Sequence, residues 1–147
     1  KPVDLGGMWD VKSFSENSLT LDYCDYYFDG ELQQKNCYIP LTQPISTKEG
    51  VERVRRIKEE TGARILCGIM PLISRRNALF MKNEIAGIAV TDELIARYPE
   101  KASREEGEAV GIAIAREVME YTQEFVDGYY FSFPFNRVYL LEKILNF

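Results

Sequence analysis

Hydrophobic positions from residue 38 onward alternate between short apolar runs and longer amphipathic stretches. The apolar runs predict strands at 38–43, 64–70 and 129–133. Between and after them, hydrophobic residues recur three and four positions apart, which is the spacing of a helix with one buried face. Strands that alternate with helices favour parallel pairing through right-handed crossovers. We therefore expect an α/β fold made of parallel βα units.

Capping residues mark where the predicted helices begin. Ser46 with Glu49, and Ser103 with Glu106, both have the spacing of a capping box, in which two side chains satisfy free backbone N–H groups. Gly62 provides a stop for the first helix. The expected helices are 47–61 after Ser46, a helix to 81 or 83 after Ser74, one to about 98 after Thr91, one to about 125 after Ser103, and a last helix over 136–145.

Periodicity also predicts which side chains face inward. In the longest helix the expected buried stripe is Gly107, Val110, Ile114, Val118, Tyr121 and Phe125. Small residues at 107, 109, 111, 113 and 115 would let this helix pack closely on a sheet. For the last helix the expected inward residues are Val138, Leu141 and Leu145. The run from Ile85 to Val90 is a candidate for one more short strand.

Residues 1–37 do not follow this pattern and form an irregular, aromatic-rich segment ahead of the βα units of residues 38–147. Asp29-Gly30 is a turn signal that favours a hairpin-like segment. The cluster Tyr23, Tyr26, Tyr27 and Phe28 offers either a platform for a ligand or ordinary packing in a core or interface.

Composition narrows the classes of function. The net charge of −5 argues against general nucleic-acid binding, which depends on basic surface. No apolar run approaches the roughly 20 residues of a membrane span, and no stretch resembles a signal peptide. Three cysteines without a CxxC pair fit a reducing compartment. We expect a cytoplasmic protein of 147 residues in one domain.

Histidine is absent from the sequence. This removes histidine-dependent nucleophile triads and the common zinc sites, so we expect no metal. Acid–base chemistry would fall to Asp, Glu, Lys, Tyr or Cys, and these are too numerous for the sequence to single out a catalytic residue.

Two strand ends carry the most distinctive residues. Thr42-Gln43-Pro44 closes the first predicted parallel strand, and the segment Gly68–Leu72 closes the second. The carboxyl ends of parallel strands meet at one rim of a sheet or barrel, where α/β folds place their chemistry. The sequence therefore predicts a functional rim that includes both segments.

These two segments and their spacing resemble the methylenetetrahydrofolate reductase family, and the resemblance extends over residues 38–147. Further matching words are Arg76-Asn77-Ala78, Asn83-Glu84 and Asn136-Arg137. The resemblance implies three units from the end of a (β/α)₈ barrel, FAD as cofactor and NADH or NADPH as electron donor. It also implies reduction of 5,10-methylenetetrahydrofolate to 5-methyltetrahydrofolate, in one-carbon metabolism and methionine biosynthesis. The family's catalytic glutamate and most of its FAD contacts lie earlier in the barrel, and we identify no counterpart in residues 1–37.

The resemblance also assigns candidate site residues. Gln43, beside Thr42, matches a glutamine that contacts the pterin, although a glutamine at a strand end can equally cap a loop. Arg137 and Phe135 match a pair that lies along folate. Phe80 and Met81 fall where the family covers its ligand, yet their spacing also suits a helix core, and Lys35 is a weaker match to a flavin-phosphate lysine.

Three functional hypotheses follow. The chain is a flavin-dependent folate reductase or a part of one. Alternatively it is a binding module that keeps the folate-facing rim without turnover. A third possibility is that its open sheet edges are completed by another chain or a second copy.

Overall fold

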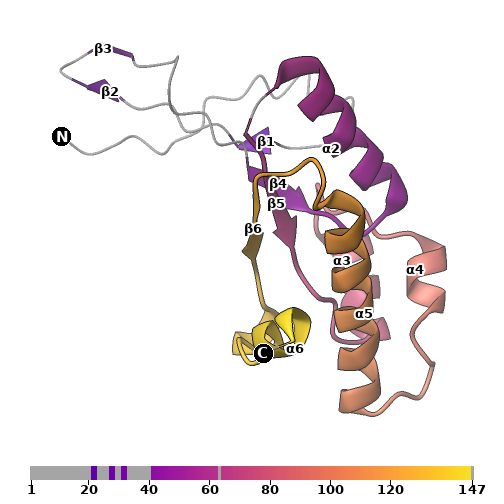
Figure 1. Cartoon of the computed structure of the whole chain (residues 1–147). Coiled ribbons are helices and arrows are strands. Elements are labelled where there is room, and N and C mark those ends of the chain that lie inside the picture. Colours follow the sequence, from indigo (N-terminus) through magenta and orange to yellow (C-terminus); the bar gives the residue numbers. More distant parts are fainter. Residues whose placement is uncertain (1–20, 23–26, 29–30, 33–40, 63, 147) are drawn as a thin grey trace.

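The fold is given by a computed structural model that describes residues 21–22, 27–28, 31–32, 41–62 and 64–146. Strands β4 (Leu41–Pro44), β5 (Leu66–Ile69) and β6 (Gly128–Phe131) form a parallel sheet, and β1 (Leu21–Asp22) pairs antiparallel with β4. The sheet order is β1-β4-β5-β6 (Figure 1). The three predicted parallel strands are confirmed.

A second, two-stranded sheet lies near the start of the chain. Strand β2 (Tyr27–Phe28) pairs antiparallel with β3 (Glu31–Leu32), Tyr27 opposite Leu32 and Phe28 opposite Glu31. This pairing agrees with the hairpin expected around residues 29–30. The turn itself, and the candidates Tyr23, Tyr26 and Lys35, lie outside the described residues.

Helices connect the parallel strands and cover one side of the sheet. Helix α2 (Lys48–Thr61) joins β4 to β5, and α5 (Arg104–Thr122) leads into β6; both lie on the same side of the sheet (Figure 1). Successive strands are thus added in one direction with their helices on one side, as repeated βα units require. The described strands form an open sheet with β1 and β6 at its edges. The remaining helices are α3 (Arg75–Glu84), α4 (Asp92–Ala96), the short 3₁₀ helix η1 (Pro134–Asn136) and α6 (Leu140–Leu145).

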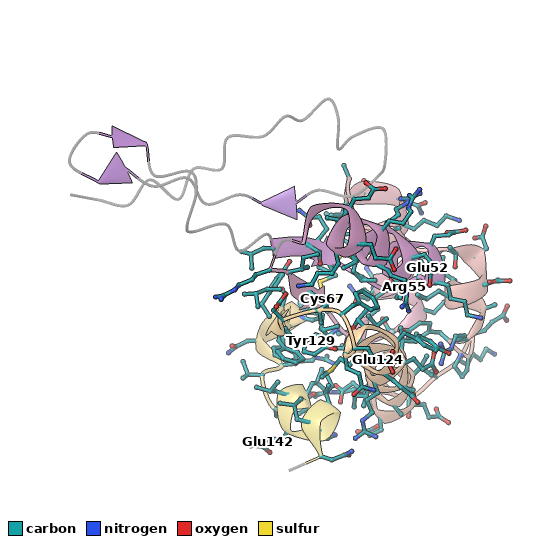
Figure 2. All side chains as sticks on the ribbon, turned by 45° about the horizontal axis from the view of Figure 1, so that its top comes forward. Glu52, Arg55, Cys67, Glu124, Tyr129 and Glu142 are labelled. Carbon is teal, nitrogen blue, oxygen red and sulfur yellow. The ribbon has the colours of Figure 1, made fainter. Side chains whose placement is uncertain are left out.

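The main hydrophobic core fills the space between this sheet and the helices α2, α5 and α6. Cys67 and Ile69 of β5 meet Val54 of α2 and Val118 of α5 there. Cys67 and Tyr129 lie on the helix-covered side of the sheet, whereas Glu52 and Arg55 are on the outer surface of α2 (Figure 2). A second cluster packs α3 and α4 against α5 and the segment after β5; it contains Leu72, Ala78, Val90, Leu94, Ile95, Tyr98 and Ile114.

Helix α5 approaches the chain after β5 very closely. A Cβ atom at Gly107 would lie 2.5 Å from the carbonyl oxygen of Ile73, and one at Gly111 only 2.1 Å from that of Leu72. Close packing through small residues is therefore confirmed at 107 and 111. At these two glycines it is directed at the backbone of Leu72 and Ile73 rather than at the strands. Ala115 is buried in the core cluster with Cys67 and Ile69 of β5, whereas the small residues at 109 and 113 are exposed.

The capping predictions hold for three helices and fail for one. Ser74, Thr91 and Ser103 are the N-caps of α3, α4 and α5, and the box between Ser103 and Glu106 is present. The N-cap of α2 is Thr47, not Ser46, because Thr47 Oγ1 accepts the N–H of Gly50 at 3.1 Å. The hydroxyl of Ser46 donates instead to the carbonyl of Ala89.

Two local predictions are wrong. Residues 85–90 do not form a strand, because Gly87 adopts φ = 88°, which turns the chain away from an extended path. The last helix begins at Leu140 rather than 136, since Phe135 and Asn136 have positive φ values that are incompatible with it. Its buried residues are accordingly Leu140 and Ile144, while the predicted Val138 and Leu145 are exposed.

The predicted stripe of α5 is correct at Gly107, Ile114 and Val118 but wrong at Tyr121, which is exposed. Two polar residues that were not expected are buried on this helix, Glu108 and Thr122. Thr122 donates its hydroxyl back to the carbonyl of Val118, so its polar atom is satisfied within the helix.

Candidate functional site

The carboxyl ends of β4, β5 and β6 lie side by side. Pro44 is opposite Gly68, Gly68 is opposite Tyr130, and Ile69 is opposite Phe131. The expected meeting of Thr42–Pro44 with the Gly68–Leu72 segment at one edge is therefore confirmed. Parallel α/β sheets bind ligands at the carboxyl ends of their strands. We therefore take this end of the sheet, called the edge from here on and distinct from the outer strands β1 and β6, as the candidate site.

Thr42 has a structural role at this edge. Its side chain is only 1% exposed. Its Oγ1 accepts the N–H of Gly68 at 2.9 Å and donates to the carbonyl of Gln43 at 2.8 Å. Because both hydrogen bonds go to backbone groups, the hydroxyl holds β4 on β5 and shapes the strand end.

Gln43 is half-buried and contributes to the wall of a small recess. The recess has a volume of about 20 Å³ and also involves Arg53 of α2 and Gly87 and Ala89 of the loop after α3. Sites for small organic ligands usually enclose roughly 300–1,000 Å³. A ring would therefore lie against this edge from outside, not inside the recess.

A buried carboxylate forms the second feature of the edge. Glu108 is 4% exposed. Its Oε1 accepts hydrogen bonds from Arg104 Nε at 3.0 Å, Arg137 Nη1 at 2.5 Å and Tyr139 Oη at 2.5 Å. Within this group of contacts, two guanidinium groups face one carboxylate. The arrangement ties the first turns of α5 to the segment that follows β6.

The charge of Glu108 is stabilised by these partners. Burial alone would raise the pKa of this carboxyl group, but the hydrogen bonds from Tyr139 and Arg104 and the charge of Arg137 outweigh it and lower the pKa. Sequence reasoning missed Glu108. The available signal was its position between Gly107 and Gly111 on the buried stripe, with Arg104 four residues earlier.

The other predicted site residues do not form a single group. Arg137 is engaged with Glu108, and Phe135 nearby is 77% exposed with φ = 55°. On α3, Phe80 is 51% exposed, whereas Met81 packs against the second core cluster. Asn77 is buried and accepts the N–H of Ile73 at 3.2 Å, which shapes the turn after β5.

Two larger hollows lie away from the predicted residues. A groove of about 280 Å³ runs between the start of α2, α4 and α5, where Arg97 and Glu117 form a two-pronged ion pair at 2.6 and 2.7 Å. A more open hollow of about 400 Å³ lies between the end of α5 and α6. None of the predicted site residues within the described ranges lines either of them, and Lys35 lies outside those ranges.

The described part of the chain offers no group of three or more Cys, Asp or Glu side chains that could hold a metal ion. It also contains no helix long and apolar enough to cross a membrane. The 20 Å³ recess at Gln43 is far too small for an isoalloxazine ring. This recess therefore does not hold the flavin ring.

No protein-family model and no curated protein matches the chain. The resemblance of residues 38–147 to the folate reductase family stays a prediction from the sequence.

Proposed function

We propose that this chain supplies the folate-binding wall of a flavin-dependent reductase that converts 5,10-methylenetetrahydrofolate to 5-methyltetrahydrofolate. The observation that carries the proposal is the position of Gln43 at the shared carboxyl edge of three parallel strands. A carboxamide presents one donor and one acceptor side by side, which complements the paired donor and acceptor groups of a pterin edge.

The positive charge near Arg137 supports the same ligand class. Folate carries carboxylates at the end opposite its pterin, and Arg104 and Arg137 together outnumber the single carboxylate of Glu108. The side chain of Arg104 is 59% exposed. In this proposal the guanidinium pair attracts the carboxylates, and Phe135 and Phe80 offer apolar surface to the rings.

A barrel is the proposed context of the three βα units. Strands added in one direction, with helices on one side, also characterise consecutive units of a (β/α)₈ barrel. The outer edges of β1 and β6 would then meet further strands from another chain or a second copy. Bound FAD would supply the hydride, and NADH or NADPH would be the electron donor. The contacts to FAD would come from outside the described residues. The proposed compartment is the cytoplasm.

The first test is binding of 5-methyltetrahydrofolate by isothermal calorimetry, with an absorbance spectrum of the purified chain before and after addition of FAD. We expect binding heat, and an affinity that the Gln43→Ala substitution lowers but leaves measurable. The control is Gln123→Ala, whose exposed side chain makes one hydrogen bond to the carbonyl of Glu120. Equal binding by wild type and Gln43→Ala would refute the role of Gln43, and the absence of any binding by the wild type would refute the folate assignment.

One observation favours a second candidate, a folate-binding module without turnover. A general acid needs a raised pKa to be protonated near neutral pH. In the described residues, each carboxyl group with a clear shift has a lowered pKa, through partners such as Arg97 for Glu117 and Lys58 for Asp127. Folate binding without reductase activity, in the presence of FAD and NADH, would select this alternative.

A further inference from the structure

The backbone around Gln43 is held on both sides of its Cα atom. The peptide unit between Thr42 and Gln43 contains the carbonyl oxygen of Thr42, which accepts a hydrogen bond from the hydroxyl of Tyr130. The peptide unit between Gln43 and Pro44 contains the carbonyl oxygen of Gln43, which accepts a hydrogen bond from Thr42 Oγ1 at 2.8 Å. Peptide units are planar, so fixing two successive units fixes the direction of the Cα–Cβ bond between them.

Pro44 adds a third restraint. Proline disfavours helical conformations in the residue before it and favours an extended backbone, which fits the position of Gln43 in β4. The side chain of Gln43 therefore starts from a defined direction. Of the three restraints, only the bond from Tyr130 comes from a distant part of the sequence, 88 residues away.

Tyr130 reaches Thr42 by passing over the strand between them. Tyr130 belongs to β6 and Thr42 to β4, and β5 separates the two. At the crossing point stands Gly68, directly opposite Tyr130. A Cβ atom there would lie 2.6 Å from the Tyr130 hydroxyl oxygen and 2.9 Å from the Thr42 carbonyl oxygen. Only glycine leaves room for the tyrosine to cross.

From this geometry we infer that Tyr130 is a positioning residue, which holds Gln43 in the orientation that receives the pterin. The inference rests on the proposed function of Gln43. Tyr130 does not itself need to touch the ligand; it acts through the Thr42 carbonyl. Gly68 has a matching role, because it clears the path for the Tyr130 ring.

Tyr129 provides a matched control on the same strand. Its hydroxyl donates to the carbonyl of Met119 at 2.9 Å and lies 3.0 Å from Thr122 Oγ1, on the helix-covered side of the sheet. Tyr129→Phe and Tyr130→Phe therefore each remove one hydrogen-bonded hydroxyl group from β6. Only the Tyr130 change is connected to Gln43.

The first experiment is a double-mutant cycle measured as affinity for 5-methyltetrahydrofolate. We expect Tyr130→Phe to weaken binding about fivefold, the ratio that corresponds to one net hydrogen bond. In a Gln43→Ala background the same change should have no further effect, and Tyr129→Phe should bind as the wild type does. Unchanged binding by Tyr130→Phe, or an equal loss in both backgrounds, would overturn the inference.

A second measurement needs no ligand. The Gly68 amide donates to Thr42 Oγ1 at 2.9 Å, and the Ile45 amide donates to the Gly68 carbonyl at 3.0 Å. Both should exchange hydrogen about fivefold faster in Tyr130→Phe than in the wild type. The amide of Asp127, bonded to Ile65 at the other end of the sheet, should not change.

The two measurements separate the two proposals. If Gly68 and Ile45 exchange at the wild-type rate, Tyr130 does not hold the strand end, and the inference is wrong whatever the ligand. If their exchange accelerates but the wild type binds no folate, the hold on Gln43 is supported and the folate assignment fails.

Discussion

Substitution of Gly111 by alanine sets two physical effects against each other. Gly111 lies in the middle of α5, where a Cβ atom would be 2.1 Å from the carbonyl oxygen of Leu72 and 3.0 Å from its carbonyl carbon. These are backbone atoms, so no side-chain rotation can relieve the contact. The same oxygen accepts a hydrogen bond of 2.8 Å from the buried hydroxyl of Tyr98, which holds it in place.

The expected magnitude follows from the geometry. Helix propensity alone favours alanine over glycine by about 1 kcal/mol. To reach the 3.0 Å that Cβ atoms require, α5 and Leu72 must separate by about 0.9 Å, which loosens the packing of Ile114 and Ala115. Overpacking of a rigid core costs about 1–3 kcal/mol. We take the upper part of this range, because backbone atoms form the contact, and expect a net destabilisation of about 2 kcal/mol.

The assay is urea unfolding followed by circular dichroism. Gly50→Ala in α2 is the comparison, because a Cβ atom there would meet side-chain atoms of Ile45 at 3.1 Å and Thr47 at 3.3 Å, and these can adjust. We expect Gly50→Ala to change the free energy of unfolding by less than about 1 kcal/mol. A Gly111→Ala protein as stable as the wild type would show that α5 is not seated on the Leu72 backbone.

Two further predictions concern ionisation. The lowered pKa of Glu108 means that its charge contributes stability above the pKa of the unfolded chain, about 4.3, and that this contribution is lost as the pH falls through the folded value. Glu108→Gln should therefore be less stable at pH 7 by about 1–3 kcal/mol and lose less stability than the wild type between pH 7 and pH 3; equal losses would contradict this. Burial raises the pKa of the Cys67 thiol to about 11. The peptide that contains Cys67 should therefore stay unlabelled by iodoacetamide at pH 8 until denaturant is added. Labelling of Cys67 in the native protein would show that the core is open.

Features with local causes could be predicted from the sequence. The box of Ser103 and Glu106 and the stop at Gly62 depend on residues within one helical turn, and both are present. The apolar run at β5 indicated a buried parallel strand because both faces of that strand are covered or crossed. Alternation of such runs with helices was enough for the α/β arrangement.

Features decided by distant partners could not. The N-cap of α2 is Thr47 rather than the predicted Ser46, because Ser46 bonds Ala89, 43 residues away. From its local sequence, Glu108 would be predicted to lie in solvent, because its partners Arg137 and Tyr139 are about 30 residues later in the chain. The register of α6 depends on Phe135 and Asn136 in left-handed conformations, which no composition signal indicated.

The candidate site shows the same division. Strand-end position alone brought Thr42 and Gln43 to the shared edge, since the carboxyl ends of parallel strands must coincide. The role of Tyr130 could not be predicted, because nothing in residues 128–131 distinguishes Tyr130 from Tyr129. The two hydroxyl groups differ only because adjacent residues of a strand point to opposite faces of the sheet.

Asp127 gives the opposite end of the sheet a means to report on folding. Its carboxylate accepts the N–H of Ile65 at 2.8 Å and pairs with Lys58 at 2.7 Å, and its own N–H donates to the carbonyl of Ile65. These bonds join residues more than 60 positions apart. They can form only once the third βα unit has docked on the first two. Protection of the Ile65 amide would therefore time the completion of the sheet during refolding, separately from formation of the helices.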